Sequence, residues 1–163
     1  MNLSIVPLAE SHFDSLRWVF DSIAREKRYL AFLQAPPLEQ NLDFYRNIVA
    51  KNLCHLVAVL DGEVVGWCDV LPFNGEARAH SGTLGIGLAP HARHIGIGAK
   101  LMDAAIKRAW KSGFSRIELI VRADNENAKT LYERFGFTVE GTNQQAFFVD
   151  GVFYDTYSMA LLR

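Results

Sequence analysis

The stretch from Pro90 to Met102 constrains the fold of this chain most strongly, because it places a glycine loop between an apolar run and an amphipathic helix. Its core reads Arg-x-x-Gly-x-Gly and ends at Gly98. Apolar residues then recur at three- to four-residue spacing, which predicts a helix with one buried face. The preceding residues 83–88 have the length and apolar content of a buried strand. The order is therefore strand, tight glycine loop and helix.

This arrangement suits the binding of an anion. The first turn of a helix has unpaired N–H donors and the positive end of the helix dipole, and glycine lets a phosphate approach the backbone. The loop lacks the Gly-Lys-Ser/Thr ending of a nucleotide P-loop, since Ala99 and Lys100 follow Gly98. A dinucleotide-binding fingerprint requires a third glycine or alanine where this chain has Leu101. A plain helix-entry loop is the alternative to a phosphate site, and the motif alone does not decide between them.

Composition limits the classes of protein that this chain can belong to. Its 163 residues, 50% of them hydrophobic, predict one domain over residues 1–163 with a single core. A formal charge of −1 gives no general attraction to nucleic acid or to an anionic membrane. Cys54 and Cys68 have neither disulfide nor zinc spacing, so we expect two buried thiols and no metal. Without a signal peptide or a long apolar run, the expected location is the cytoplasm.

Hydrophobic patterns along the chain predict an α/β protein in the α+β sense, with a mixed, mostly antiparallel sheet of six or seven strands flanked by four helices. Asp61-Gly62 and Asp150-Gly151 are turn signals for two hairpins. A crossover helix between strands 83–88 and 117–121 implies parallel or splayed pairing of these two. The expected helices cover residues 13–25, 38–49, 98–110 and 128–135. The other segments with a strand pattern are 3–6, 55–60, 63–70, 137–141, 146–149 and 152–162.

A second motif lies about thirty residues after the glycine loop, in the same kind of strand and helix context. Residues 127–137 read Asn-Ala-Lys-Thr-Leu-Tyr-Glu-Arg-Phe-Gly-Phe. The two motifs and the order of elements resemble the GCN5-related N-acetyltransferase (GNAT) family over nearly the whole chain. Residues 140–142 and 150–159 resemble a bacterial subgroup that acylates small amines, including free amino acids. The resemblance implies a GNAT-like sheet with splayed central strands and acetyl-coenzyme A (acetyl-CoA) as the acyl donor.

The resemblance also implies where the donor binds. The N–H groups of residues 94–99 would hold the pyrophosphate, with Arg93 as an adjacent cation, and the pantetheine arm would pair with backbone at residues 86–88. Asn127 would bond to the pantetheine or orient the following helix, and its alternative role is a helix N-cap. The expected donor-binding residues are Ile86, Leu88, Arg93, His94, Gly96, Ile97, Gly98, Ala99 and Asn127.

Two catalytic roles follow from the same resemblance. Tyr132 occupies the position of the general acid that protonates the departing thiolate, and its alternative role is packing on the apolar face of its helix. Residues 81–88 contain no carboxylate, although many family members have a catalytic base there. His80 has a suitable pKa for this role, with an ordinary surface position as the alternative. The Leu88 N–H is the expected oxyanion donor. Further candidates for the base are Glu118, Asp69 and Glu26.

The acceptor site is expected between the connector that follows the first helix and the terminal hairpin. The candidate residues are Glu26, Tyr29 and Phe32 on the connector, and Phe147 and Tyr154 on the hairpin. Solvated charge and ordinary core packing are the alternatives for these side chains. The resulting hypothesis is transfer of an acetyl group to the primary amine of a small molecule in a ternary complex. Acetylation of peptide or protein amino termini and a non-catalytic acyl-CoA-binding module are the alternatives, and a homodimer is a further expectation.

Overall fold

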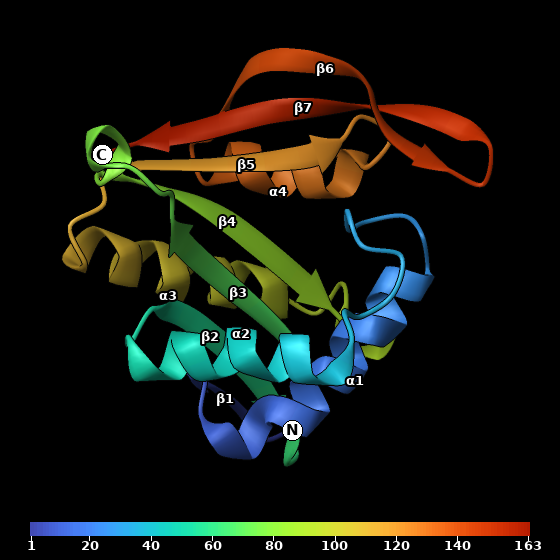
Figure 1. The fold of residues 1–163 in the computed structure, drawn as a ribbon. Helices are drawn as coiled ribbons and strands as arrows, with labels where there is room; N and C mark the ends of the chain where they lie inside the picture. Colours follow the sequence, from blue (N-terminus) through green and yellow to red (C-terminus); the bar gives the residue numbers. More distant parts are fainter.

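A computed structural model describes residues 1–163 and contains one seven-stranded sheet (Figure 1). The strand order is β1-β2-β3-β4-β5-β7-β6, and only the β4–β5 pair is parallel. This mixed and mostly antiparallel sheet confirms the predicted fold class. The strands are β1 (Leu3–Pro7), β2 (Cys54–Leu60), β3 (Glu63–Pro72), β4 (Ser81–Leu88), β5 (Arg116–Arg122), β6 (Thr138–Val149) and β7 (Val152–Leu162).

Four α-helices flank the sheet, as predicted (Figure 1). They are α1 (Phe13–Arg25), α2 (Leu38–Ala50), α3 (Ile97–Lys111) and α4 (Glu126–Arg134). The alternation of side chains along β2 shows that α2 and α3 cover opposite faces. Cys54 places its Sγ 3.5 Å from the Ala105 carbonyl of α3, whereas the next residue, His55, lines a cavity together with residues of α1 and α2. Both faces of the central strands are therefore buried.

The two central strands separate along their length. β4 and β5 are paired only at their beginnings, where residues 81–83 lie opposite residues 116–118. Beyond this point β4 stays with β3 and β5 stays with β7, so residues 84–88 and 119–122 have no partner across the gap. The strands form a V that opens towards the glycine loop, as Figure 1 shows. The splayed pairing that the crossover helix implied is present.

The two predicted hairpin turns are confirmed. Asp61-Gly62 and Asp150-Gly151 have positive φ at both positions, which is the geometry of a type I′ turn. The division of residues 137–149 into two strands was wrong, because β6 runs continuously from Thr138 to Val149. Register shifts near Gly141 and between Asn143 and Phe147 absorb the polar residues without ending the ladder.

The core lies between the sheet and its helices. A cluster of 31 buried residues joins α1, α2 and α3 to the strands and extends to Tyr132 on α4 and to Phe137. Leu101, Met102, Ala105 and Ile106 supply the predicted buried face of α3. None of the helices has the length and apolar character needed to cross a lipid bilayer.

Candidate active site

A cavity of about 550 Å³ lies where β4 and β5 separate, and we call it the main cavity. The Ala89 N–H donates to the Val65 carbonyl on β3, so alternation along this pair turns the backbone groups of Ile86 and Leu88 towards β5. Because β5 has diverged here, these groups face the cavity instead of a neighbouring strand. The predicted site residues that line the main cavity are Tyr29, Ile86, Leu88, Arg93, His94, Gly96, Gly98, Ala99, Asn127 and Tyr132.

The glycine loop brings unpaired N–H donors to one end of this cavity. Gly96 is the N-cap of α3 with φ +89°, a left-handed conformation that favours glycine. No side chain caps the helix, and the N–H groups of Ile97, Gly98 and Ala99 have no backbone acceptor. Ile97 buries its side chain in the core, so it contributes only its N–H. The loop therefore has the geometry of an anion site rather than that of a capped helix entry.

Arg93 has a different role from the one expected of a free cation. Its guanidinium forms two hydrogen bonds with the Glu26 carboxylate, at 2.9 and 2.6 Å, and its Nε donates to the Leu88 carbonyl at 2.9 Å. The same group lies 4.8 Å from the centre of the Tyr29 ring. Hydrogen bonding to Glu26 raises the pKa of Arg93. Arg93 thus satisfies a carbonyl that the separated strands leave unpaired, and it fastens the glycine loop to the end of α1.

Tyr132 lies between the core and the main cavity. Its ring packs 6.0 Å from that of Phe137, and the residue is 7% exposed. Burial raises its pKa, so the hydroxyl retains its proton at neutral pH. Its ring belongs to the apolar face of α4, and the residue also lines the cavity, so the packing does not conflict with the predicted acid role.

Asn125, and not Asn127, is the N-cap of α4. The side chain of Asn125 caps α4 by accepting a hydrogen bond from the Ala128 N–H at 3.2 Å. Asn127 follows within the first turn of α4 and lines the main cavity. Its exposed side chain makes no hydrogen bond within the chain and is available to a ligand.

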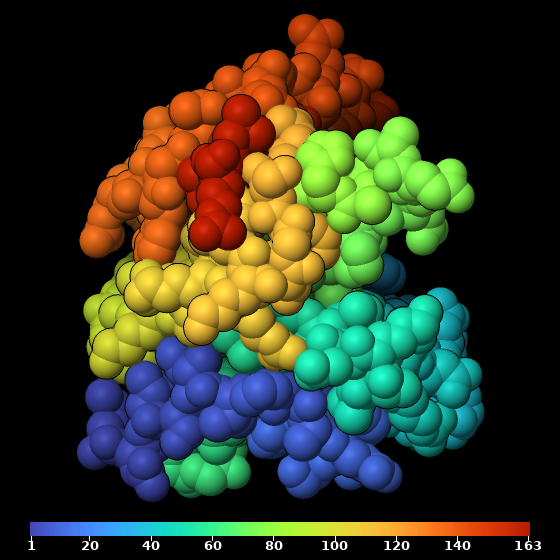
Figure 2. All heavy atoms as spheres, turned by 90° about the vertical axis from the view of Figure 1, so that its left-hand side faces the viewer, coloured from blue at the N-terminus to red at the C-terminus, as the bar shows by residue number.

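The structure does not bring His80 to this cavity. His80 is exposed and immediately precedes β4, at the end of the strand opposite the glycine loop, and its carbonyl accepts from the Ser115 N–H. Figure 2 views this side of the molecule, where the light-green loop before β4 lies near the yellow α3–β5 connection. Glu118 is also outside the cavity, and its carboxylate is held by Arg116 at 3.0 Å and Ser81 at 3.4 Å. The geometry favours another group as the base.

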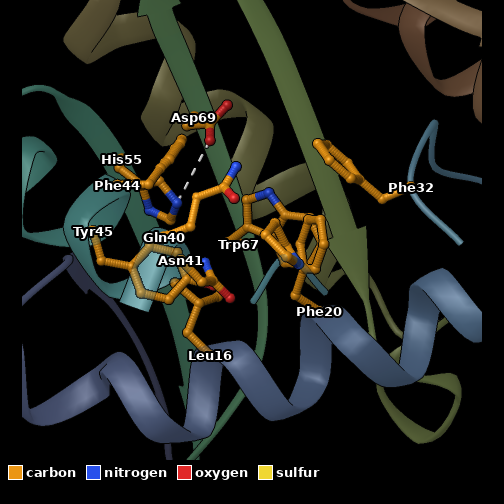
Figure 3. Close-up of a pocket in the computed structure, with 11 residues that line it drawn as sticks. Leu16, Phe20, Phe32, Gln40, Asn41, Phe44, Tyr45, His55, Trp67 and Asp69 are labelled. Carbon is orange, nitrogen blue, oxygen red and sulfur yellow. Dashed lines mark ion pairs between the residues drawn. The ribbon is translucent and has the colours of Figure 1, made fainter. Parts of the chain in front are cut away.

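A second cavity, of about 210 Å³, lies on the face of the sheet that α1 and α2 cover (Figure 3). We call it the side cavity. The Trp67 indole forms part of its wall and packs directly against Gly87, which lines the main cavity, so the two cavities are adjacent. Sequence analysis did not identify most of its lining, which comprises Leu16, Phe20, Phe32, Pro36, Gln40, Asn41, Phe44, Tyr45, His55, Trp67 and Asp69.

Asp69 and His55 form a buried pair in the side cavity. His55 Nε2 lies 3.5 Å from Asp69 Oδ2, and the Gly85 N–H donates to Asp69 Oδ1 at 3.2 Å (Figure 3). Burial raises the pKa of Asp69 to about 7, although the hydrogen bond from Gly85 opposes this shift. Burial also lowers the pKa of His55 to about 4. Asp69, which is one of the carboxylates named as candidate bases, is therefore poised to exchange a proton near neutral pH.

The raised pKa of Asp69 predicts a pH-dependent stability. Between about pH 4 and pH 7 the Asp69 carboxyl holds a proton in the folded chain that it has released in the unfolded chain, so its contribution to the free energy of unfolding falls as pH rises. The lowered pKa of His55 contributes with the opposite sign between about pH 4 and pH 6.5, and the variant and the parent share this contribution. Asp69→Asn removes the Asp69 contribution. The free energy of unfolding of the variant minus that of the parent should therefore be about 1–3 kcal/mol higher at pH 8 than at pH 5. Urea denaturation at both pH values measures this change, with the exposed Asp103→Asn as control. If the free energies of unfolding of variant and parent differ by the same amount at both pH values, Asp69 is not a buried carboxyl that stays protonated below pH 7.

The expected acceptor residues are distributed over several environments. Tyr29 lines the main cavity and Phe32 the side cavity, whereas Glu26 is paired with Arg93. On the hairpin, Phe147 and Tyr154 line neither cavity, and Tyr154 stacks 3.6 Å from the Arg122 guanidinium.

Lys27, in the connector between α1 and α2, contacts both the turn of the terminal hairpin and the end of β5. Lys27 Nζ lies 3.1 Å from Asp150 Oδ1 at the hairpin turn, and the Lys27 carbonyl accepts from Arg122 at 2.9 Å. The connector and the hairpin are therefore joined beside the open end of the V.

Comparison with known proteins identifies the family. The sequence profile described as "Acetyltransferase (GNAT) family" matches residues 16–137, which include the glycine loop and α4. The chain belongs to the GNAT family of acetyltransferases. It is 30% identical over 142 residues to the L-amino acid N-acetyltransferase AaaT of Escherichia coli (strain K12), covering 86% of this chain and 87% of that protein. These matches show that the chain is an acetyltransferase.

Two further relatives extend the comparison. The chain is 32% identical over 111 residues to N-alpha-acetyltransferase 50 of Danio rerio, covering 66% of this chain and 65% of that protein. The structure of yncA, a putative acetyltransferase from Salmonella typhimurium with its cofactor acetyl-CoA, has a TM-score of 0.92 at 17% identity, with 99% and 94% of the two chains covered. The latter likeness establishes the GNAT fold.

Proposed function

We propose that residues 1–163 act as one N-acetyltransferase domain that transfers an acetyl group from acetyl-CoA to the primary amine of a small molecule. The main cavity is the observation that supports this most, because it joins an anion-binding helix start to unpaired strand backbone and to the buried Tyr132. These features match the pyrophosphate, the peptide-like arm and the thioester of the proposed donor. The domain would work in the cytoplasm, with a homodimer as an additional possibility.

The donor-binding role is supported by the chemistry of the residues that line the main cavity. The free N–H groups of residues 97–99 suit a pyrophosphate, and Asn127 offers an amide to the pantetheine arm. The backbone groups of Ile86 and the Leu88 N–H face the gap that the arm would occupy. A GNAT structure with acetyl-CoA bound has the same fold, which agrees with this assignment.

The proposed chemistry is direct attack by the amine on the thioester. The Leu88 N–H stabilises the oxygen that becomes negative, and the Tyr132 hydroxyl gives its proton to the departing thiolate. Asp69, directly or through water, accepts the proton that the amine releases, which its pKa of about 7 favours. His80 stays outside this scheme because it is distant along β4.

A small acceptor is favoured by the enclosure of the site. Lys27 joins the connector to the hairpin turn at Asp150 and to the end of β5 at Arg122, and the cavity next to the main one holds only about 210 Å³. Similarity to an L-amino acid N-acetyltransferase over most of both chains supports the same class. The runner-up, acetylation of peptide amino termini, is supported by the similarity to N-alpha-acetyltransferase 50.

A panel of acceptors distinguishes these functions. Thiol release from acetyl-CoA is measured with free amino acids and small amines, and with short peptides of the same amino-terminal residues. The proposal predicts kcat/KM at least about 10-fold higher for the small amines than for the peptides, about 1.4 kcal/mol of transition-state discrimination. Higher values for the peptides would favour the runner-up. Donor binding without turnover on any acceptor would favour a non-catalytic acyl-CoA-binding module.

A further inference from the structure

The side cavity contains polar atoms that the folded chain leaves without partners. Asn41 Oδ1, the Tyr45 hydroxyl and His55 Nδ1 are buried without a well-aligned hydrogen-bond partner. The Asn41 amide lies beside the Tyr45 hydroxyl, and the His55 ring lies beside its own backbone. The three atoms belong to residues that are only 3–5% exposed, and all three line this cavity. Native structures rarely leave buried polar atoms unpaired, because their desolvation is then uncompensated. Three such atoms around one cavity give it unused hydrogen-bonding capacity that suits a polar group of a ligand.

The walls of the cavity indicate the rest of the ligand. Phe20 lies 5.3 Å from Trp67 and 5.7 Å from Phe32, measured between ring centres, so aromatic rings line one side. Phe32 is 54% exposed, which places it at the open end, whereas the polar atoms lie in the buried part (Figure 3). A flat apolar body fits such walls. No lysine or arginine lines the cavity, so nothing there pairs with a carboxylate or a phosphate.

A hydroxyl is the group that suits these polar atoms. It donates to Asn41 Oδ1, which is only an acceptor, and accepts from the Tyr45 hydroxyl. An apolar tip would add no hydrogen bond to either atom, and a carboxylate would meet Asn41 Oδ1 without a hydrogen between them.

We infer that the side cavity binds the side group of the acceptor, and that this group is an aromatic ring carrying a hydroxyl, as in a phenolic primary amine. The inference rests on the proposed function, because the acceptor's amine must reach the adjacent main cavity. Trp67 separates the two cavities and packs on Gly87, so a ligand seated beside this indole lies next to the separated strands. The cavity then selects the acceptor, while the main cavity binds the donor.

Tyramine and phenethylamine test this inference, because they differ only in the hydroxyl. Binding of each amine is measured by calorimetry in the presence of coenzyme A, and kcat/KM is measured with acetyl-CoA. Tyramine should bind at least about 10-fold more tightly, and Tyr45→Phe should reduce this preference to about 2-fold or less. Tyr157→Phe, which changes a tyrosine outside both cavities, is the matched control and should keep the preference.

Stability measurements separate a binding role from a structural one. The Tyr45 hydroxyl has no well-aligned hydrogen-bond partner within the chain. Tyr45→Phe should therefore leave the Tm unchanged or raise it. If this variant fails to fold, Asn41→Leu tests the same preference. Equal binding of the two amines, or a preference that survives both substitutions, would overturn the inference and show that the cavity holds only water. Hydroxyl-dependent binding without acetylation of any amine would support the inference and contradict the proposed function.

Discussion

Replacing Tyr132 with phenylalanine is expected to lower kcat by about 10²- to 10⁴-fold, the range typical of a lost general acid. The residue lines the main cavity and its hydroxyl is protonated at neutral pH, so in the parent it can donate to the departing thiolate, while its raised pKa opposes complete transfer of the proton. Phenylalanine keeps the ring and its contact with Phe137, and the fold should therefore persist. Steady-state rates and calorimetric affinity for coenzyme A are measured on both proteins, and the affinity should change by less than about 3-fold.

The control for this experiment is Tyr157→Phe, which removes a hydroxyl of β7 that lines neither cavity. Its kcat should match that of the parent. If Tyr132→Phe instead retains the parental kcat, the tyrosine serves only the packing of α4, and water or another group protonates the thiolate. A parallel loss of coenzyme A affinity would indicate that the substitution disturbs the donor site.

Replacing Ala99 with aspartate is expected to weaken coenzyme A binding by about 100-fold or more. Ala99 lies in the first turn of α3 and lines the main cavity, so the new carboxylate would stand next to the bound pyrophosphate. At a surface-like effective dielectric constant, two charges about 4 Å apart repel by about 4 kcal/mol, and partial exposure reduces this value. An acidic residue at a helix start stabilises the free protein, so the loss should concern binding alone.

Ala99→Asn is the matched variant, because it has nearly the same size without the charge. It should weaken coenzyme A binding by less than about 10-fold. The difference in coenzyme A affinity between the Asp and Asn variants should decrease at high salt. Calorimetry with coenzyme A measures both effects. Equal affinities for the Asp and Asn variants would place the phosphates away from the start of α3.

The sequence was sufficient to predict the fold because its local signals agree. Hydrophobic periodicity sets the four helices, and the Asp-Gly turns set two hairpins whose backbone is as expected. The exception is β6, where polar residues 142–145 resemble a loop. Their backbone remains in the ladder through a bulge, in which the Gln145 N–H bonds to Asp155. Such cross-strand pairing is non-local and leaves no trace in the spacing of apolar residues.

Most of the residues expected to bind the donor could be grouped from the sequence because they lie in two motifs, and the structure brings most of them to one cavity. The role of Arg93 was not, since it depends on Glu26, which lies 67 positions earlier in the chain. Likewise, the missing strand carboxylate drew attention to His80, which immediately precedes β4 in sequence and therefore lies at the end of the strand away from the glycine loop. Proximity in sequence along a strand does not imply proximity in space, because each residue extends it by about 3.3 Å.

The side cavity could be recognised only in the structure. Its polar residues come from α2, β2 and β3, and none belongs to a motif. One signal was present, since His55 and Asp69 interrupt two otherwise apolar strands. These residues face each other across the β2–β3 pair, which the Asp61-Gly62 turn connects.

A single-turnover experiment tests the central claim most directly. The protein is mixed in excess over acetyl-CoA with a primary amine from the panel, quenched at intervals and analysed by mass spectrometry. The account predicts that the acetylated amine appears as acetyl-CoA disappears, in equal amounts and without an acetylated form of the protein. Bound acetyl-CoA that persists with every amine, or an acetyl group that passes first to the chain itself, would contradict it.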